Sequence, residues 1–178
     1  MKTSNLSLRG MILASMFGAA TAAGAYIMIP LPLVPITLQT LFLNLAAALL
    51  GGSLGALSQV VYVLIGIIGL PVFAGGKAGF GVLLGPTGGY LIGFIAGAYV
   101  VGKLIEIRGR PGFVWTACAM VIGMIVIYAC GVTQLSIIAK ISINKSISVG
   151  VLFFLIGDAL KIVAAALLSL KLKNIIRA

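Results

Sequence analysis

Side chains that could perform catalysis are scarce in this sequence. It has no histidine, and its 178 residues include only two acids, Glu106 and Asp158. Catalytic metal sites and membrane proteases usually need clusters of histidine or carboxylate residues. We therefore expect no metal site, no cofactor and no enzymatic activity.

Cysteine is almost as rare. Cys118 and Cys130 are twelve residues apart in one apolar segment. Twelve helical residues span about 18 Å, which is too far for a mutual disulfide. We interpret both cysteines as apolar packing residues.

Charge is also scarce, while apolar residues dominate. Only 8% of the residues are charged and 62% are hydrophobic. The mean hydropathy is +1.29. A soluble domain carries about 25% charged residues, so most of this surface must lie in lipid. At about 20 residues per crossing, the sequence predicts an all-α integral membrane protein, a single domain of residues 1–178 that forms a bundle of six transmembrane helices.

Proline and glycine divide the apolar sequence into segments. The predicted spans are residues 11–29, 37–50, 54–70, 87–107, 113–135 and 146–170, with residues 136–145 as a loop or short interfacial helix. The first segment also has the composition of a signal peptide, but we expect a retained span. Pro30, Pro32 and Pro35 predict an ordered apolar loop after it. Residues 71–90 are rich in glycine, which permits close approach of backbone to a ligand.

The net charge of +10 indicates membrane topology rather than nucleic-acid binding, because the basic residues are scattered among apolar spans. If successive loops alternate between the two sides of the membrane, one side holds Lys2, Arg9, Lys103, Arg108, Arg110, Lys171, Lys173 and Arg177. The other side holds only Lys77, Lys140 and Lys145. The positive-inside rule then places both termini in the cytoplasm. The proline-rich and glycine-rich loops consequently open outside, where an imported ligand would arrive.

The most informative motif is Asp158 with Lys161, inside a nearly uncharged segment. Residues three apart share a helix face, so both charges project to one place at membrane depth. Each alone costs about 2.5 to 3.5 kcal/mol at a helix centre, and such residues usually face a bundle interior or a cavity. A structural ion pair is the alternative interpretation. We favour a polar ligand site, because a carboxylate accepts and an ammonium donates hydrogen bonds.

Lys77 lies in a glycine-rich stretch that suggests a phosphate-binding loop. That interpretation fails, because no Ser or Thr follows the lysine and Pro71 stands where the first glycine would fall. Lys77 then either caps a bound carboxylate or faces water and lipid headgroups.

Two further sets of residues have two interpretations each. Ala14, Gly18 and Ala22 form a small-residue stripe that permits close helix contact, either within the bundle or with another protein. The residues that either line a cavity or only join neighbouring helices are Gln39, Thr40, Asn44, Tyr62, Tyr90 and Trp115.

Several motifs together resemble the BioY family over nearly the whole chain. They are PLPLVPITLQT at residues 30–40, GLPVFAGG at 69–76, GPTGGY at 85–90 and the late Asp158-x-x-Lys161. BioY proteins are biotin-binding S components of energy-coupling factor (ECF) transporters. The resemblance implies a six-helix substrate-binding subunit in a prokaryotic cytoplasmic membrane. It also implies a coupling transmembrane subunit and two ATPase subunits as partners, with ATP hydrolysis confined to them.

The resemblance also implies roles for individual residues. Asp158 and Lys161 would contact biotin, and the glycine-rich loop closes over the ligand in related proteins, which makes Lys77 and Tyr90 candidates. Gln39 is a further candidate for the ligand site. The stripe of Ala14, Gly18 and Ala22 resembles the docking surface that S components offer to the coupling subunit.

Other functions remain open from the residues themselves. A self-sufficient secondary transporter of a small vitamin-like solute would use Asp158 to carry a proton and Lys161 to respond to its charge. A small membrane scaffold would use the pair only to fix helix register. A membrane enzyme ranks last, because catalytic groups are lacking.

Overall fold

The computed structural model describes residues 7–109 and 111–177. Within these residues the chain is mostly helical. Its elements, in chain order, are α1 (Leu8–Tyr26), β1 (Met28–Ile29), β2 (Ile36–Thr37), α2 (Gln39–Leu50), α3 (Gly52–Ile67), the short helix η1 (Phe80–Val82), α4 (Gly88–Arg108), α5 (Phe113–Ala139), α6 (Ile143–Ile147), the π-helix η2 (Ser148–Leu152) and α7 (Leu155–Arg177).

The helices of this described part are those of a multi-pass membrane protein. Three of them, α1, α4 and α5, are each long and apolar enough to cross a membrane. The bent pair Ile143–Leu152 and Leu155–Leu172 passes the same test as one span. Helices α2 and α3 are apolar but shorter, and the 12 residues of α2 extend only about 18 Å. The predicted all-α membrane class is confirmed.

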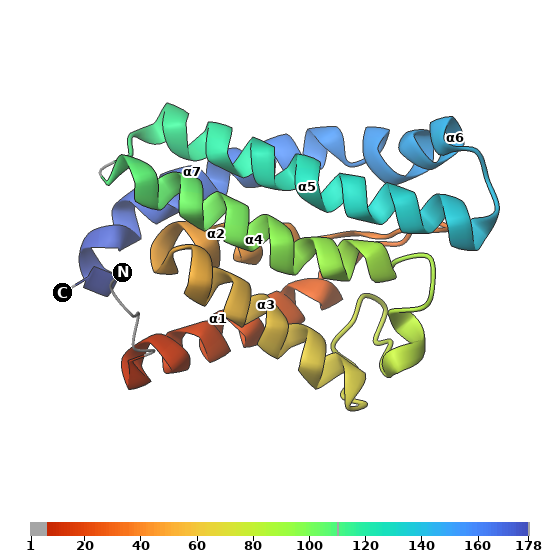
Figure 1. Cartoon of the computed structure of the whole chain (residues 1–178), viewed down its shortest axis with the longest axis horizontal. Coiled ribbons are helices and arrows are strands. Elements are labelled where there is room, and N and C mark those ends of the chain that lie inside the picture. Colours follow the sequence, from red (N-terminus) through yellow and green to blue (C-terminus); the bar gives the residue numbers. More distant parts are fainter. Residues whose placement is uncertain (1–6, 110, 178) are drawn as a thin grey trace.

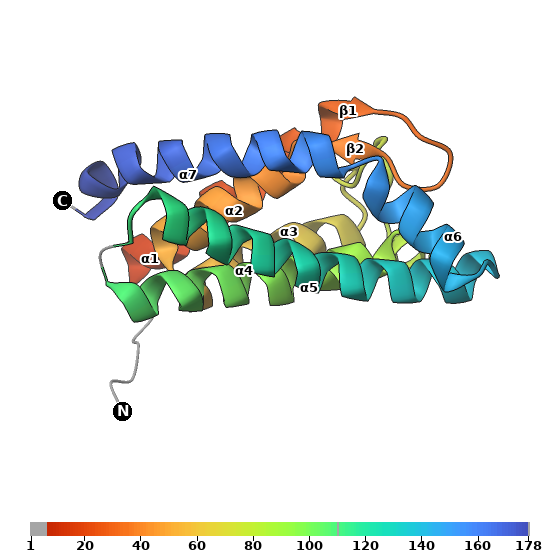
Figure 2. The ribbon, with the colours of Figure 1, turned by 90° about the horizontal axis from the view of Figure 1, so that it is seen from above.

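The helices run back and forth along one long axis (Figures 1 and 2). Helix α2 lies at the centre of the bundle, where it packs against α1, α3, α4 and α7. Nine of its residues are buried. Helix α4 packs against α5 and α3, and α1 packs against α3. Helix α1 begins and α7 ends at the same end of the bundle (Figure 1).

The turn between α2 and α3 packs directly on α4. Gly51 has φ +86°, a left-handed conformation that glycine tolerates best. A Cβ atom at Gly102 would overlap the backbone of Gly51 and Gly52, so only glycine permits this contact. Glu106 then caps the beginning of α3 by accepting a hydrogen bond from the Gly52 N–H at 2.8 Å.

The prediction of one continuous helix over residues 146–170 is wrong. This segment contains the end of α6, the π-helix η2, a break and then α7, and its two parts are bent by 47°. A π-helix interrupts the regular hydrogen-bond ladder and is a known cause of helix kinks. The structure provides a partner for the disturbed backbone, because the Tyr90 hydroxyl donates to the Gly150 carbonyl at 3.0 Å.

The two loops that precede α2 and α4 meet at one end of the bundle. The proline-containing segment is ordered and forms the antiparallel ribbon of β1 and β2, in which Ile29 pairs with Ile36. The Tyr26 hydroxyl, just before this ribbon, donates to the Pro71 carbonyl in the glycine-rich segment. Both loops therefore contribute to the same face.

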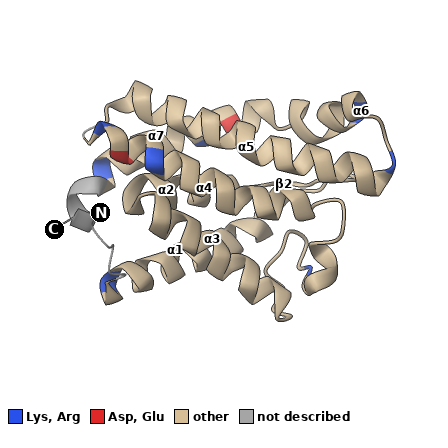
Figure 3. Cartoon of the chain, in the orientation of Figure 1, with Lys and Arg blue, Asp and Glu red and all other residues tan. Residues whose placement is uncertain are grey.

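Charged residues gather at the two ends of the bundle, with few between them (Figure 3). Four of the basic residues used to predict topology provide no side-chain information: Lys2 and Arg110 lie outside the described residues, as do the side chains of Lys173 and Arg177. The exception to the pattern is the pair Asp158 and Lys161, which is buried within the bundle.

Candidate functional site

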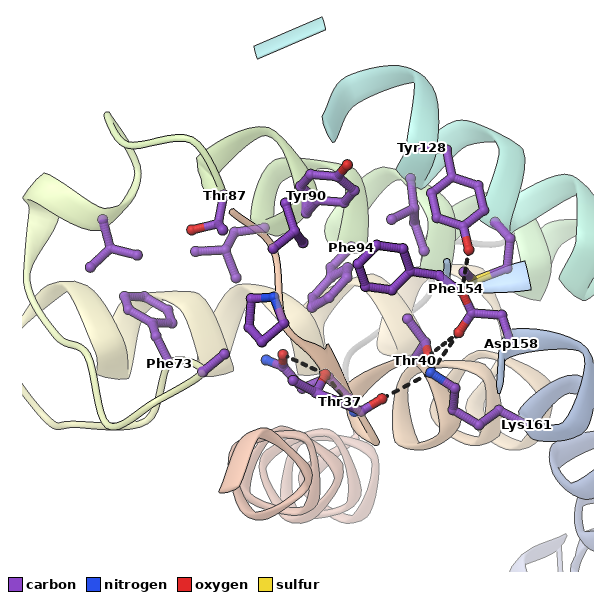
Figure 4. A pocket seen from close by; sticks show the side chains of 18 of the residues that line it. Thr37, Thr40, Phe73, Thr87, Tyr90, Phe94, Tyr128, Phe154, Asp158 and Lys161 are labelled. Atoms are coloured by element: carbon purple, nitrogen blue, oxygen red, sulfur yellow. Dashed lines mark hydrogen bonds and ion pairs between the residues drawn. The ribbon is translucent and has the colours of Figure 1, made fainter. Parts of the chain in front are cut away.

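A cavity opens between the helices beneath the two loops (Figure 4). The empty space inside it, including the open mouth, is about 710 Å³. The centre of a water molecule can occupy about 80 Å³ of that space. Its polar lining residues are Thr37, Gln39, Thr40, Lys77, Thr87, Tyr90, Tyr128, Asp158 and Lys161. Its apolar lining includes Val34, Pro35, Phe73, Val82, Leu91, Phe94, Met124, Ile127 and Phe154. All five residues predicted for the ligand site therefore line one cavity.

Asp158 receives hydrogen bonds from three elements. Its Oδ1 lies 2.5 Å from Lys161 Nζ and accepts from the Thr40 hydroxyl of α2 at 3.1 Å. Its Oδ2 accepts from the Tyr128 hydroxyl of α5. Each carboxylate oxygen has two lone pairs, so one acceptor position on Oδ2 remains for a ligand.

Lys161 is held as firmly as its partner. Besides the ion pair, its Nζ donates to the Thr37 carbonyl at 2.9 Å, just before α2 begins. An ammonium has three N–H groups, so one donor remains for a ligand. The pair thus presents one free donor beside one free acceptor.

The bend in the last span contributes to the electrostatics of Asp158. Because α7 starts at Leu155, Asp158 lies in its first turn. The free N–H groups and positive dipole end of a helix stabilise a carboxylate there. The helix break therefore places a favourable field around the buried acid.

Gln39 connects the cavity to a buried polar network. Its side-chain oxygen accepts from the Thr37 hydroxyl at 2.9 Å, and its Nε2 donates to the Tyr62 hydroxyl. Tyr62 is fully buried on α3, behind the cavity wall. Gln39 is thus held in a fixed orientation at the cavity surface.

Lys77 lies at the mouth of the cavity and is exposed. Its carbonyl accepts from the Phe73 N–H at 3.0 Å, which closes a tight turn. Gly75 and Gly76 within this turn have φ +76° and +70°. The glycines therefore shape a loop that presents a cation at the cavity mouth.

Three of the six polar or aromatic candidates do not line this cavity. Tyr62 lies behind it, and Asn44 is buried with no hydrogen-bond partner for either side-chain amide atom. Trp115 is thirteen residues from Tyr128 along α5, about 20 Å away. Its indole N–H donates to the Leu104 carbonyl at 2.9 Å.

Sequence reasoning missed Tyr128, which bonds Asp158 directly. Tyr128 shares a helix face with Met124, four residues before it, which also lines the cavity. A tyrosine hydroxyl in the middle of an apolar span is the signal that could have revealed it. Thr37 was missed because Lys161 uses its backbone carbonyl, which the residue type does not encode.

The small-residue stripe of α1 faces the bundle in this structure. Ala14 and Gly18 are buried, and Ala22 is half-buried. A Cβ at Gly18 would lie 2.9 Å from the Ser58 carbonyl oxygen, so the stripe permits close packing on α3. The exposed small residues of α1 are Ser15, Ala19 and Ala23. The docking role of the stripe stays a prediction.

These features define a multi-pass helical membrane protein with a cavity that holds a buried ion pair. Within the described residues, no group of three or more His, Cys, Asp or Glu side chains could hold a metal ion.

The family model for the BioY family matches residues 1–178, and the chain belongs to this family. It is 47% identical over 168 residues to the biotin transporter BioY of Thermotoga maritima, with 94% of this chain and 98% of the relative covered. It is 42% identical over 177 residues to a probable biotin transporter BioY of Lysinibacillus sphaericus, with 96% and 90% covered.

A solved structure has the same architecture. It is the crystal structure of the S-component for biotin from an ECF-type ABC transporter, which superimposes with a TM-score of 0.86 at 26% identity. The match covers 98% of this chain and 95% of that one.

Proposed function

We propose that this chain is the biotin-binding membrane subunit of an ECF-type uptake transporter. The observation that carries the proposal is the free acceptor of Asp158 beside the free donor of Lys161, inside a largely apolar cavity. The relatives named as biotin transporters support biotin as the ligand.

The chemistry of biotin suits this site. Its ureido group carries an N–H donor next to a carbonyl acceptor, which match the Oδ2 of Asp158 and the Nζ of Lys161. Its fused ring is largely apolar and would contact the aromatic wall at Phe94 and Phe154. Its carboxylate tail would extend toward the mouth, where Lys77 provides a positive charge.

We propose that Gln39 and Tyr90 belong to the same ligand site in different ways. The Gln39 amide is oriented by Thr37 and Tyr62, so it would present a fixed polar surface to the ligand. Tyr90 would contribute its ring to the wall, because its hydroxyl already bonds the Gly150 carbonyl.

The proposed topology has six crossings, with α2 and α3 as short spans and the bent pair as the last. An even number of crossings leaves both termini on one side, and the excess of basic residues makes that side the cytoplasm. The proposed location is the cytoplasmic membrane of a prokaryote. The cavity mouth then faces outside.

The proposed partners are a coupling transmembrane subunit and two ATPase subunits. The resemblance to an S-component from an ECF-type transporter supports this assembly. Helix α1 is the proposed docking element through Ala14, Gly18 and Ala22. Because Ala14 and Gly18 pack on α3, its exposed neighbours Ser15 and Ala19 would meet the partner first.

Calorimetric titration of the detergent-purified chain with biotin, thiamine and riboflavin tests the ligand. Saturable binding of biotin alone is the expected result. Absence of binding to any of the three would refute the proposal and favour a membrane scaffold. Trp115 fluorescence is a poor readout here, because the indole is distant from the cavity.

Uptake into liposomes distinguishes the proposed subunit from a self-sufficient secondary transporter. Liposomes that contain only this chain should accumulate no biotin, with or without a proton gradient. Gradient-driven accumulation by the chain alone would show that no ATP-driven partner is needed.

A further inference from the structure

We propose that Tyr90 is a positioning residue that fixes the bend of the last span, and thereby the place of Asp158 and Lys161 in the ligand site. This inference rests on the proposed function and assigns Tyr90 a specific role within it.

Tyr90 is wedged between two glycines on different elements. A Cβ at Gly131 of α5 would overlap the Tyr90 ring, and a Cβ at Gly150 of η2 would overlap its hydroxyl. Tyr90 itself is only 7% exposed. The ring and the hydroxyl therefore occupy space that exists only because both positions lack a side chain.

The hydroxyl bonds the one segment of the last span that is not a regular helix. It donates to the carbonyl of Gly150, in the middle of the π-helix Ser148–Leu152. The 47° bend comes immediately after this π-helix along the chain, and α7 begins at Leu155. Tyr90 thus fixes the backbone immediately before the bend.

The residues after the bend form the ligand site. Phe154 lines the cavity, and its carbonyl accepts from the Asp158 N–H at 2.8 Å. Tyr128 holds the Asp158 side chain on this side of the bend. The last span is therefore held before the bend by Tyr90, and after it by the bonds to Tyr128, Thr40 and the Thr37 carbonyl.

This arrangement predicts how the ligand site responds to a change at the bend. If the Gly150 carbonyl loses its partner, the angle between η2 and α7 becomes less defined. The free donor and acceptor of the ion pair then lose their fixed orientation toward the cavity, and affinity for a rigid bicyclic ligand falls.

A double-mutant cycle tests the positioning role. Tyr90→Phe should weaken biotin binding about fivefold, the effect typical of one lost hydrogen bond. Gly150→Ala should weaken it further, by about 30-fold or more, because its Cβ displaces the Tyr90 hydroxyl. The double variant should bind about as well as Tyr90→Phe alone, because without the hydroxyl the Cβ meets only Leu135 Cδ2 at 3.1 Å, the end of a flexible side chain, and Tyr90 Cζ at 3.6 Å.

Two matched controls belong to this cycle. Gly157→Ala changes a residue of the same span, but the Cβ atom added there would only contact Ile36 Cγ2 at 3.9 Å. Tyr99→Phe removes a hydroxyl from the same helix as Tyr90, at a side chain that is 46% exposed. Both should bind biotin like the unmodified chain. Absence of rescue in the double variant would overturn the proposal.

A distance measurement that needs no ligand separates this proposal from the proposed function. Nitroxide labels at Asn144 and Leu167, both exposed and on opposite sides of the bend, report its angle after Cys118 and Cys130 are replaced by alanine. Tyr90→Phe should broaden the distance distribution, whereas Tyr99→Phe should not. An unchanged distance distribution together with weaker biotin binding would make Tyr90 a direct ligand contact and refute its positioning role. Failure of the unmodified chain to bind biotin would refute only the proposed function.

Discussion

Among the described residues, two ion pairs have the same chemistry and the same spacing but opposite surroundings. Lys103 and Glu106 of α4 are 2.8 Å apart, and their side chains are 42% and 41% exposed. Asp158 and Lys161 of α7 are 2.5 Å apart, with side chains only 7% and 10% exposed. Local sequence makes both pairs possible, but only the second lies in a cavity.

The partners of the two pairs explain their different roles. Glu106 uses its other oxygen to cap Gly52, so the exposed pair secures a turn between helices. The buried pair draws its partners from α2, α5 and the segment before α2. An exposed pair is screened by water and salt, whereas a buried charge depends on every partner it has.

The largest difference between the pairs should appear when one lysine is removed. Lys161→Met leaves the Asp158 carboxylate buried without its counter-charge, which typically costs about 3 to 5 kcal/mol. For a chain of this size that lowers the midpoint of thermal unfolding by roughly 10 °C. Lys103→Met should leave the midpoint nearly unchanged. Equal shifts for the two variants, measured in the same detergent, would show that burial does not distinguish the pairs.

Neutralising the two acids compares their roles in ligand binding. Asp158→Asn should weaken biotin binding about tenfold or more, because a charge-assisted hydrogen bond contributes about 1.5 to 3 kcal/mol. Glu106→Gln, its matched control, should bind biotin normally and lose only part of the α3 cap. Calorimetric titration measures both. An unchanged dissociation constant for Asp158→Asn would make the buried pair a structural one.

Removal of a supporting hydroxyl should have a smaller effect. Tyr128→Phe leaves the ion pair intact but deletes the bond to Oδ2, and we expect biotin binding to weaken about fivefold. Tyr99→Phe is the control, since Tyr99 lies near Lys103 of the exposed pair. If Tyr128→Phe binds as tightly as the unmodified chain, Oδ2 is positioned without Tyr128.

The smallest effect should come from the exposed cation at the cavity mouth. Lys77→Gln should weaken biotin binding only two- to threefold, because an exposed charge is screened by solvent. The difference from the unmodified chain should shrink further as salt is raised. Titrations at low and high ionic strength check this. A salt-independent loss would indicate that Lys77 makes a desolvated contact with the carboxylate.

Sequence reasoning found the family from its motifs, and it found the buried pair from composition. In a span with almost no charge, Asp158 and Lys161 stand out, and their spacing places them on one face whether or not the helix is bent. The bend itself was missed, because apolar content and length alone favour a continuous helix. It depends on Tyr90, sixty residues earlier in the chain.

Contacts between distant segments account for the other differences between the sequence predictions and the structure. The bond from Tyr128 to Asp158 and the one from Lys161 to the Thr37 carbonyl depend on how α2, α5 and α7 pack. The stripe of Ala14, Gly18 and Ala22 was predicted with two interpretations, because small residues at this spacing permit close contact with a helix of the bundle and with one of another protein alike. The first five predicted segments begin and end within four residues of helices α1 to α5, because proline, glycine and charge mark those ends.

The single tryptophan has a use that follows from its position. Trp115, in the first turn of α5, lies under the guanidinium of Arg108, 4.9 Å from the ring centre. Helix α5 begins at the end of the bundle where α1 begins and α7 ends, away from the glycine-rich loop (Figure 1). With no second indole in the chain, its emission reports on that end alone. The protein therefore carries an optical probe of the end that the proposed topology places in the cytoplasm, separate from any signal of ligand binding.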